Sequence, residues 1–185
     1  MIKFVKENFD NILKLAVNQI AMTIFGLLLS AATFSNKSIL LATGVLSAVF
    51  YLYLVYTAAW DIGARDKIKI DGGRMKKIKL KGLYLALLSN SVIILLSLIA
   101  LICFYLGEYN KLQWAVNTTA VTYNIAWLLN GMYISLMSFG NIIPLKYYLM
   151  LLSVIPALIT SALAYTAGSH NFRLLSLLGI NTDKK

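Results

Sequence analysis

The chain has 185 residues, of which 59% are hydrophobic and 13% charged, and its formal net charge is +10. Soluble domains average roughly 25% charged residues, so this composition excludes an ordinary water-soluble fold. Five stretches contain no Asp, Glu, Lys or Arg, and each reaches the roughly 20 residues that a helix needs to cross a hydrocarbon core. These stretches are 15–34, 38–60, 82–107, 112–144 and 147–172.

The uncharged stretches predict an all-α fold, in which five transmembrane helices form one polytopic bundle and a single domain, 1–185. The expected spans lie at about 12–34, 38–60, 82–107, 114–139 and 147–168.

The first expected span follows Lys3 and Lys6, as the core of a secretory signal would. Glu7 and Asp10 also precede it, and its roughly 20 apolar residues exceed the 7 to 15 of a signal core, so we interpret it as a retained span. Cys103, the only cysteine of the chain, lies in the third expected span. It can form neither an internal disulfide nor a pair of metal-binding thiols.

Small and hydroxyl side chains recur at helical spacing in four of the expected spans. They favour close helix contacts in lipid, where association depends on van der Waals packing and interhelical hydrogen bonds. We therefore predict packing seams at Gln19, Thr23, Gly26 and Ser30; at Gly44 and Ala48; at Ala86, Asn90, Ser97 and Ala100; and at Ser153, Ala157, Ser161, Ala164 and Gly168.

The segment 61–81 is rich in charge, with eight basic and three acidic residues. Lys and Ile alternate on both sides of Gly72 and Gly73, which predicts a short basic hairpin loop on the cytoplasmic side, between the second and third helices. Candidate contacts to anionic lipid headgroups or to a protein partner are Arg65, Lys67, Lys69, Arg74, Lys76, Lys77, Lys79 and Lys81.

Three roles remain open for this loop: an anchor that orients the protein, a docking surface for an acidic partner, and a phosphate site at the Gly72-Gly73-Arg74 turn. Nucleic acid is not expected as a partner, because orientation in the membrane accounts for the positive charge. Asp61, beside the interfacial Trp60, is expected to pair with Lys14 or Arg65.

The fourth expected span carries polar residues on more than one face, which predicts a position at the centre of the bundle. Two interpretations stay open for its polar side chains and for the amide side chains on neighbouring helices that could bond to them. They line a hydrated cavity, or they form an interhelical hydrogen-bond network. The residues concerned are Gln19, Asn90, Asn117, Tyr123, Asn124 and Asn130.

Basic residues favour the cytoplasmic ends of membrane spans, and five spans with a cytoplasmic amino terminus place 12 of them inside and 5 outside. Arg173, Lys184 and Lys185 belong to a tail, 170–185, that is expected to lie in the membrane interface. A cytoplasmic tail would change the distribution to 15 and 2. The last stretch, broken by Pro156, could then be re-entrant.

The expected spans hold no ionisable side chain at depth, which disfavours a proton relay through the membrane. His170 is the only histidine, and it lies at the end of the last span without a neighbouring carboxylate in the sequence. A catalytic base needs a positioned partner, and no motif of a hydrolase or nucleotide-binding enzyme is present. We therefore expect no enzyme, no cofactor and no metal site.

Three segments resemble small multi-pass membrane proteins of clostridial-type Gram-positive bacteria. They are NQIAMTIF at 18–25, WDIGARD at 60–66, and IDGGR at 70–74, which precedes Lys81-Gly82-Leu83. The resemblance covers about the first half of the chain, up to Asn90. It implies a bacterial cell membrane and no particular activity.

Two functions are consistent with these features. The favoured one is a non-catalytic accessory or scaffold component of a membrane complex, which docks through the basic loop. The alternative is a small channel or transporter that uses the polar fourth helix.

Overall fold

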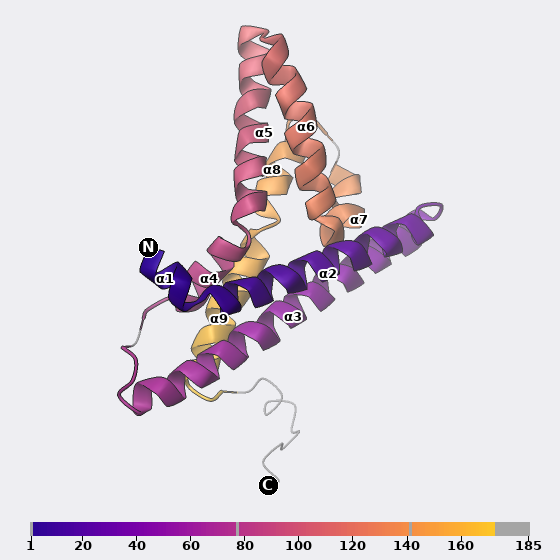
Figure 1. Ribbon diagram of the computed structural model, residues 1–185. Helices are drawn as coiled ribbons and strands as arrows, with labels where there is room; N and C mark the ends of the chain where they lie inside the picture. The colour runs from indigo at the N-terminus through magenta and orange to yellow at the C-terminus, as the bar shows by residue number, and fades with distance from the viewer. Residues whose placement is uncertain (1, 77, 141, 173–185) are drawn as a thin grey trace.

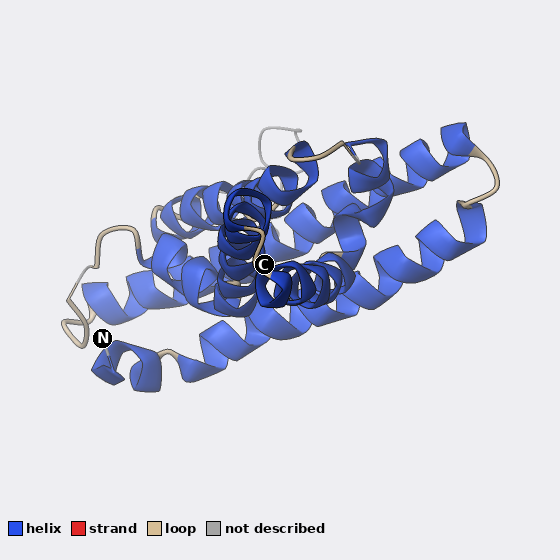
Figure 2. Ribbon diagram, turned by 90° about the horizontal axis from the view of Figure 1, so that it is seen from above, coloured by secondary structure: helices blue, strands red, loops and turns tan. Residues whose placement is uncertain are grey.

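The computed structural model describes residues 2–76, 78–140 and 142–172. Within these ranges the chain consists of helices and loops, without strands (Figure 2), which confirms the all-α prediction. The helices in chain order are α1 (Ile2–Glu7), α2 (Phe9–Thr33), α3 (Lys37–Asp71), α4 (Lys81–Ser89), α5 (Ser91–Asn110), α6 (Gln113–Leu129), η1 (Gly131–Tyr133), α7 (Ile134–Met137), η2 (Ser138–Gly140), α8 (Leu145–Leu152) and α9 (Ile155–Ser169).

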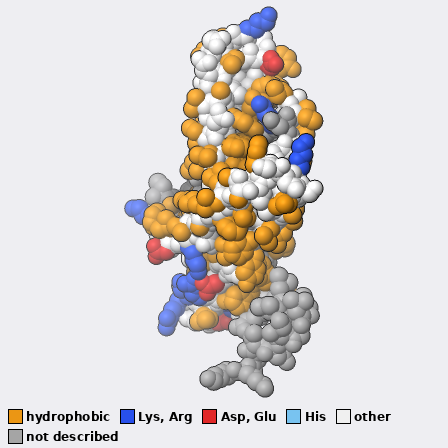
Figure 3. Space-filling view, turned by 90° about the vertical axis from the view of Figure 1, so that its right-hand side faces the viewer, with side chains coloured by type: hydrophobic (Ala, Val, Ile, Leu, Met, Phe, Trp, Pro, Cys, Tyr) orange, Lys and Arg blue, Asp and Glu red, His pale blue; other side chains and the backbone are white. Residues whose placement is uncertain are grey.

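Four helical segments are long and apolar enough to cross a membrane: Phe9–Thr33, Lys37–Asp71, Ser91–Asn110 and Leu145–Ser169. Large hydrophobic side chains on their outer faces are exposed, among them Ile24, Leu28 and Leu95. In Figure 3, hydrophobic side chains cover much of the visible face, and charged side chains are few and lie mostly toward its ends and margins. This distribution fits a protein surrounded by lipid.

The two longest helices, α2 and α3, form an antiparallel hairpin, and the α5–α6 pair rises steeply away from it (Figure 1). At the hairpin turn, Asn36 caps the amino-terminal end of α3. Its side chain accepts hydrogen bonds from the backbone nitrogens of Ser38 and Ile39, at 3.0 and 3.3 Å. The last helix, α9, packs on α3 and α4.

Three buried asparagines lie where one helix ends and another begins: Asn8, Asn90 and Asn130. Each side-chain nitrogen donates a 2.9 Å hydrogen bond to the carbonyl four residues earlier. The backbone nitrogen of each asparagine donates to the same carbonyl, at 3.0–3.1 Å, so the side-chain bond is additional to the helical bond. The asparagines thus lie at helix ends with their side-chain nitrogens paired, as an apolar surrounding requires.

These breaks change two of the expected spans. The span predicted at 82–107 is divided at Asn90 into α4 and α5. The span predicted at 114–139 is interrupted at Asn130: α6 has 17 residues and is followed by short 3₁₀ and α turns. It is not among the four helical segments of membrane-crossing length.

After α6 the chain runs along the hairpin toward its turn. The Thr23 hydroxyl donates to the Leu129 carbonyl at 2.7 Å, and Ser30 and Ser135 share a hydrogen bond of 2.6 Å. A Cβ added to Gly26 would overlap the backbone of Gly131, so these two glycines permit direct backbone contact between α2 and η1. The segment 130–135 is thereby held against α2.

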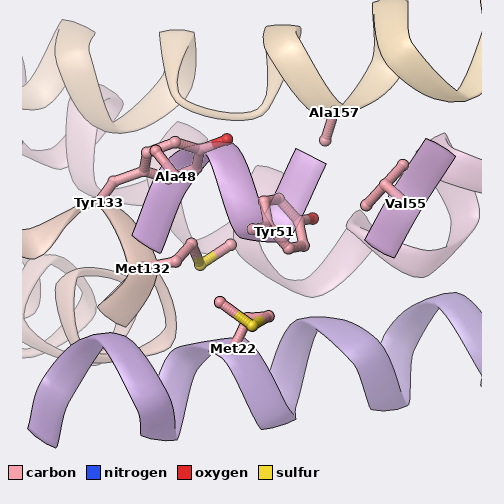
Figure 4. Close-up of a cluster of buried hydrophobic side chains, with 7 residues drawn as sticks. All are labelled: Met22, Ala48, Tyr51, Val55, Met132, Tyr133 and Ala157. Atoms are coloured by element: carbon pink, nitrogen blue, oxygen red, sulfur yellow. The ribbon is translucent and has the colours of Figure 1, made fainter. Parts of the chain in front are cut away.

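The main apolar core lies where α2, α3, η1 and α9 meet (Figure 4). The ring of Tyr51 from α3 packs edge-on against that of Tyr133, with centroids 6.0 Å apart. Met22 and Met132 fill the space between this pair and α2, and Ala157 covers it from α9. Unbranched methionines suit such an irregular gap.

The predicted packing seams are confirmed. All their residues are buried except Ser153, which is half-buried. Interhelical contacts in lipid depend on small side chains of this kind, and the seams account for where α2, α3, α4, α5 and α9 meet their neighbours.

The glycine contact between α2 and η1 gives a stability prediction. Gly26→Val should lower the free energy of unfolding by roughly 1–3 kcal/mol or more, because the new side chain overlaps the backbone at Gly131. Unfolding in a detergent series measures the loss. Ala21→Val, at an exposed position of the same helix, is the matched control and should leave stability unchanged. Equal stability of both variants would contradict the contact.

Candidate functional site: the basic connector and its buried ion pair

The charged segment 61–81 is mostly helical. The helix α3 continues to Asp71, so the predicted hairpin, with its first strand at 67–70, is wrong. Gly72 and Gly73 end the helix: the Gly72 nitrogen donates to the Ile68 carbonyl at 3.1 Å, and Gly73 has a φ of 69°, in the left-handed region. The glycine signal therefore marks a helix end. The link from α3 to α4, residues 72–80, is called the connector here.

A buried ion pair joins the two helices that flank the connector. The Lys81 ammonium at the start of α4 lies 2.7 Å from a carboxylate oxygen of Asp66 on α3, and each residue is only 3% exposed. The Tyr165 hydroxyl of α9 donates to the same oxygen at 3.0 Å. A buried charge of this kind needs its partner, because an uncompensated ion in a low-dielectric surrounding is strongly destabilising.

The helices around the pair are in backbone contact. The Ser161 hydroxyl of α9 donates to the Gly82 carbonyl at 2.8 Å, and a Cβ on Gly82 would meet the Ser161 carbonyl at 2.5 Å. Gly63 of α3 faces the backbone of Tyr165 in the same way. Close approach of three helices keeps the pair dry and its geometry fixed.

A second, exposed group of charges lies one turn earlier on α3. Asp61 accepts from Lys14 at 3.0 Å and from Arg65 at 2.5 Å, so the predicted pairing of Asp61 is confirmed with both partners. Next to it, the Trp60 indole donates to the Phe172 carbonyl at 2.7 Å. Exposed pairs of this kind contribute little stability, but they join α2, α3 and the end of α9 at one level.

The eight residues predicted to contact lipid or a partner differ in exposure and in whether they already form an ion pair. Lys81 is buried in its ion pair and cannot reach lipid or a partner, which corrects its assignment. Arg65 is bound to Asp61, Lys67 is half-buried, and Lys77 lies outside the described residues. Four exposed cations remain, and they are called the basic face of the connector here: Lys69 near the end of α3, and Arg74, Lys76 and Lys79 in the connector itself.

The six residues predicted to form a polar cavity or network do not meet at one place. Gln19, Asn90 and Asn130 are buried, and Gln19 lines a hollow together with Ser89 and Leu129, which directly precede Asn90 and Asn130. Asn130 accepts from Ser153 at 3.0 Å. Asn117 and Asn124 of α6 are exposed, and Tyr123 is half-buried.

The predicted central position of the fourth span is wrong for its first part, because α6 lies at the edge of the molecule along α5 (Figure 1). The second part, 130–135, is buried and contributes Met132 and Tyr133 to the main core. The threonines of α6 explain why this helix needs few partners. Thr118, Thr119 and Thr122 each donate to a carbonyl four residues earlier in their own helix. A hydroxyl satisfied in this way does not require a neighbouring helix.

The buried pair was not predicted, although the sequence contains a signal for it. The buried face of α3 continues at helical spacing through Ala59, Ile62 and Gly63 to Asp66. A carboxylate on such a face indicates a buried partner, which the surface-loop interpretation overlooked. Within the described ranges, no three His, Cys, Asp or Glu side chains lie close enough together to hold a metal ion.

Comparison of the chain with protein-family models, with curated proteins and with solved structures yields no match. Arguments about function therefore rest on the residues themselves.

Removing one member of the buried pair should be more harmful than removing both. Lys81→Met leaves the Asp66 carboxylate buried without a counter-ion and should cost about 3–5 kcal/mol of unfolding free energy. The double variant Asp66→Leu, Lys81→Met should recover most of that loss. Thermal and denaturant unfolding of the purified protein in detergent measure both. Additive losses in the double variant would show that the two charges are not coupled.

Proposed function

We propose that the protein is an integral, non-catalytic component of a bacterial cytoplasmic membrane, which acts as an accessory or scaffold subunit and docks a partner through the basic face of the connector. The observation that carries this proposal is the Asp66–Lys81 pair, which holds both ends of a segment whose remaining cations are exposed. The bacterial location is supported by the resemblance of segments 18–25, 60–66 and 70–74.

We further propose four membrane crossings, by α2, α3, the α4–α5 pair and the α8–α9 pair, with the α6–α7 segment re-entrant. The contacts along the chain support this path. The segment α6 to α7 meets α2 first at Thr23 and then at Ser30, nearer the hairpin turn. The next helix, α8, begins beside the second half of α5, where Tyr147 stacks on Phe104 at 4.5 Å. The chain thus enters and leaves at one end.

This topology also fits the distribution of positive charge. The ion pair and its hydrogen bond to Tyr165 bring the end of α9 to the same level as the connector. Ten described basic residues then share one side, and three lie toward the other, which supports a cytoplasmic amino terminus. The ten are Lys3, Lys6, Lys14, Arg65, Lys67, Lys69, Arg74, Lys76, Lys79 and Lys81; the three are Lys37, Lys111 and Lys146.

Cysteine labelling distinguishes this topology from five full crossings. In a Cys103→Ala background, Lys111→Cys and Ile142→Cys should both react with an impermeant maleimide in intact cells. Arg74→Cys should react only after permeabilisation, because the connector is cytoplasmic. Five crossings place residue 142 inside, so protection of Ile142→Cys in intact cells, with labelling of Lys111→Cys, would reject the re-entrant segment.

A docking function predicts a specific loss when the basic face is neutralised. The triple variant Arg74→Gln, Lys76→Gln, Lys79→Gln should keep its stability, because these exposed side chains have no ion pair among the described residues. It should lose a partner that co-purifies with the parent protein in mild detergent, as measured by quantitative mass spectrometry. Lys3→Gln, Lys6→Gln is the control for positive charge elsewhere on the same side.

Two results would contradict docking. One is retention of the same proteins by both variants. The other is equal loss from both, which would indicate that general positive charge near an anionic leaflet, worth about 1 kcal/mol for each residue, accounts for the association.

A further inference from the structure

A pocket of about 380 Å³ lies between α5, α6 and the start of α8, on the opposite side of the molecule from the connector. Its size is within the range of small-molecule sites, roughly 300–1,000 Å³. The residues that matter for its chemistry are Phe104 and Glu108 from α5, Tyr123 and Asn124 from α6, and Lys146 and Tyr147 from α8.

Two opposite charges line this pocket without neutralising each other. The ion pairs among the described residues are Lys14–Asp61, Arg65–Asp61 and Lys81–Asp66. Neither Glu108 nor Lys146 belongs to one, although both line the same pocket. Each charge is therefore available to a ligand, and the two come from different helices.

Aromatic rings hold the lysine and form the walls. The Lys146 ammonium lies 5.0 Å from the ring centre of Tyr123 and 5.1 Å from that of Tyr147. Tyr147 in turn stacks on Phe104 and packs edge-on against Tyr123, with centroids 4.5 and 5.2 Å apart. The cation is thus positioned by π faces, which leave its hydrogen-bond donors free for an anion.

An aromatic belt at the membrane interface explains why tyrosines and a lysine gather at this level. It does not explain a hollow that carries a carboxylate on one wall and an ammonium on another. An anionic ligand would meet repulsion from Glu108, and a cationic ligand would meet repulsion from Lys146. A molecule that carries both charges satisfies both residues.

We propose that this pocket binds a small zwitterion, whose anionic group contacts Lys146 and whose cationic group contacts Glu108. The Asn124 amide and the tyrosine rings complete its surroundings. Two sources supply this chemistry: a soluble molecule of the amino-acid type, and the headgroup of a zwitterionic phospholipid at the outer interface. The proposal is independent of partner docking at the connector.

Binding measurements on the full chain in non-ionic detergent test the proposal and separate its two sources. The probes are short-chain phosphatidylethanolamine, free phosphoethanolamine, and short-chain phosphatidylglycerol as an anion without a cation. Saturable binding of the first alone identifies a lipid headgroup site, and binding of the first two identifies a site for the zwitterion itself. No saturable binding of either zwitterion, or equal binding of phosphatidylglycerol, overturns the proposal.

Variants assign the two contacts. Lys146→Gln and Glu108→Gln should each weaken zwitterion binding about tenfold or more, the loss expected for one charge-assisted hydrogen bond. Lys111→Gln removes an exposed cation that does not line the pocket and should bind like the parent. Glu108→Gln should also improve binding of phosphatidylglycerol, because it removes the repulsion.

Glu108 is exposed, and the glutamine amide of Glu108→Gln has nearly the same shape as the carboxylate that it replaces. This variant should therefore fold, and it keeps the test valid even if Lys146→Gln does not fold. Unchanged probe selectivity in a folded Glu108→Gln protein contradicts the assignment of the carboxylate.

Discussion

The end of the molecule that carries the connector depends on the ion pair between Asp66 and Lys81. A charge removed from water must keep a partner at hydrogen-bond distance, so the positions of α3 and α4 are fixed relative to each other. The Tyr165 hydroxyl extends this requirement to α9. Glycines and a serine at the same level let the three backbones approach closely enough to exclude water. The exposed basic face is thus attached to a closely packed contact of three helices.

A second requirement acts along the whole chain: polar backbone groups within an apolar surrounding need hydrogen-bond partners. Helices satisfy it automatically, and helix breaks do not. At the breaks at Asn8, Asn90 and Asn130, one repeated contact pairs the side-chain amide with the carbonyl four residues earlier, which also keeps its helical backbone bond. The chain can therefore change direction at Asn130 inside the molecule, and Ser153 adds a further hydrogen bond at that point.

Much of the architecture could be predicted from the sequence, because uncharged length and small-residue spacing report directly on helices in lipid. The seams through Gly26, Ala48 and Ser161 needed no more than helical periodicity, and the Asp61 ion pairs followed from its place beside the interfacial Trp60. The fourth span failed for a local reason. Length alone cannot show that Asn130 ends a helix, or that threonines in α6 bond to their own backbone.

The candidate site was harder to predict because it depends on contacts between distant residues. Lys81 and Asp66 are separated by the connector, and Tyr165 lies 99 residues from Asp66. Alternating Lys and Ile residues at 67–70 also match a strand, although the helix that already includes Asp61 continues through them until glycine ends it.

The length of α3 determines how far the basic face lies from the bilayer core. At 1.5 Å per residue, its uncharged part, 38–60, extends about 35 Å, close to the thickness of a bilayer core. The remaining turns, 61–71, add about 16 Å along the axis, so α3 is longer than the uncharged part needs to cross the core and continues beyond it to the connector. A partner that docks at the basic face, as proposed above, would then meet these cations in the aqueous phase and not within the bilayer.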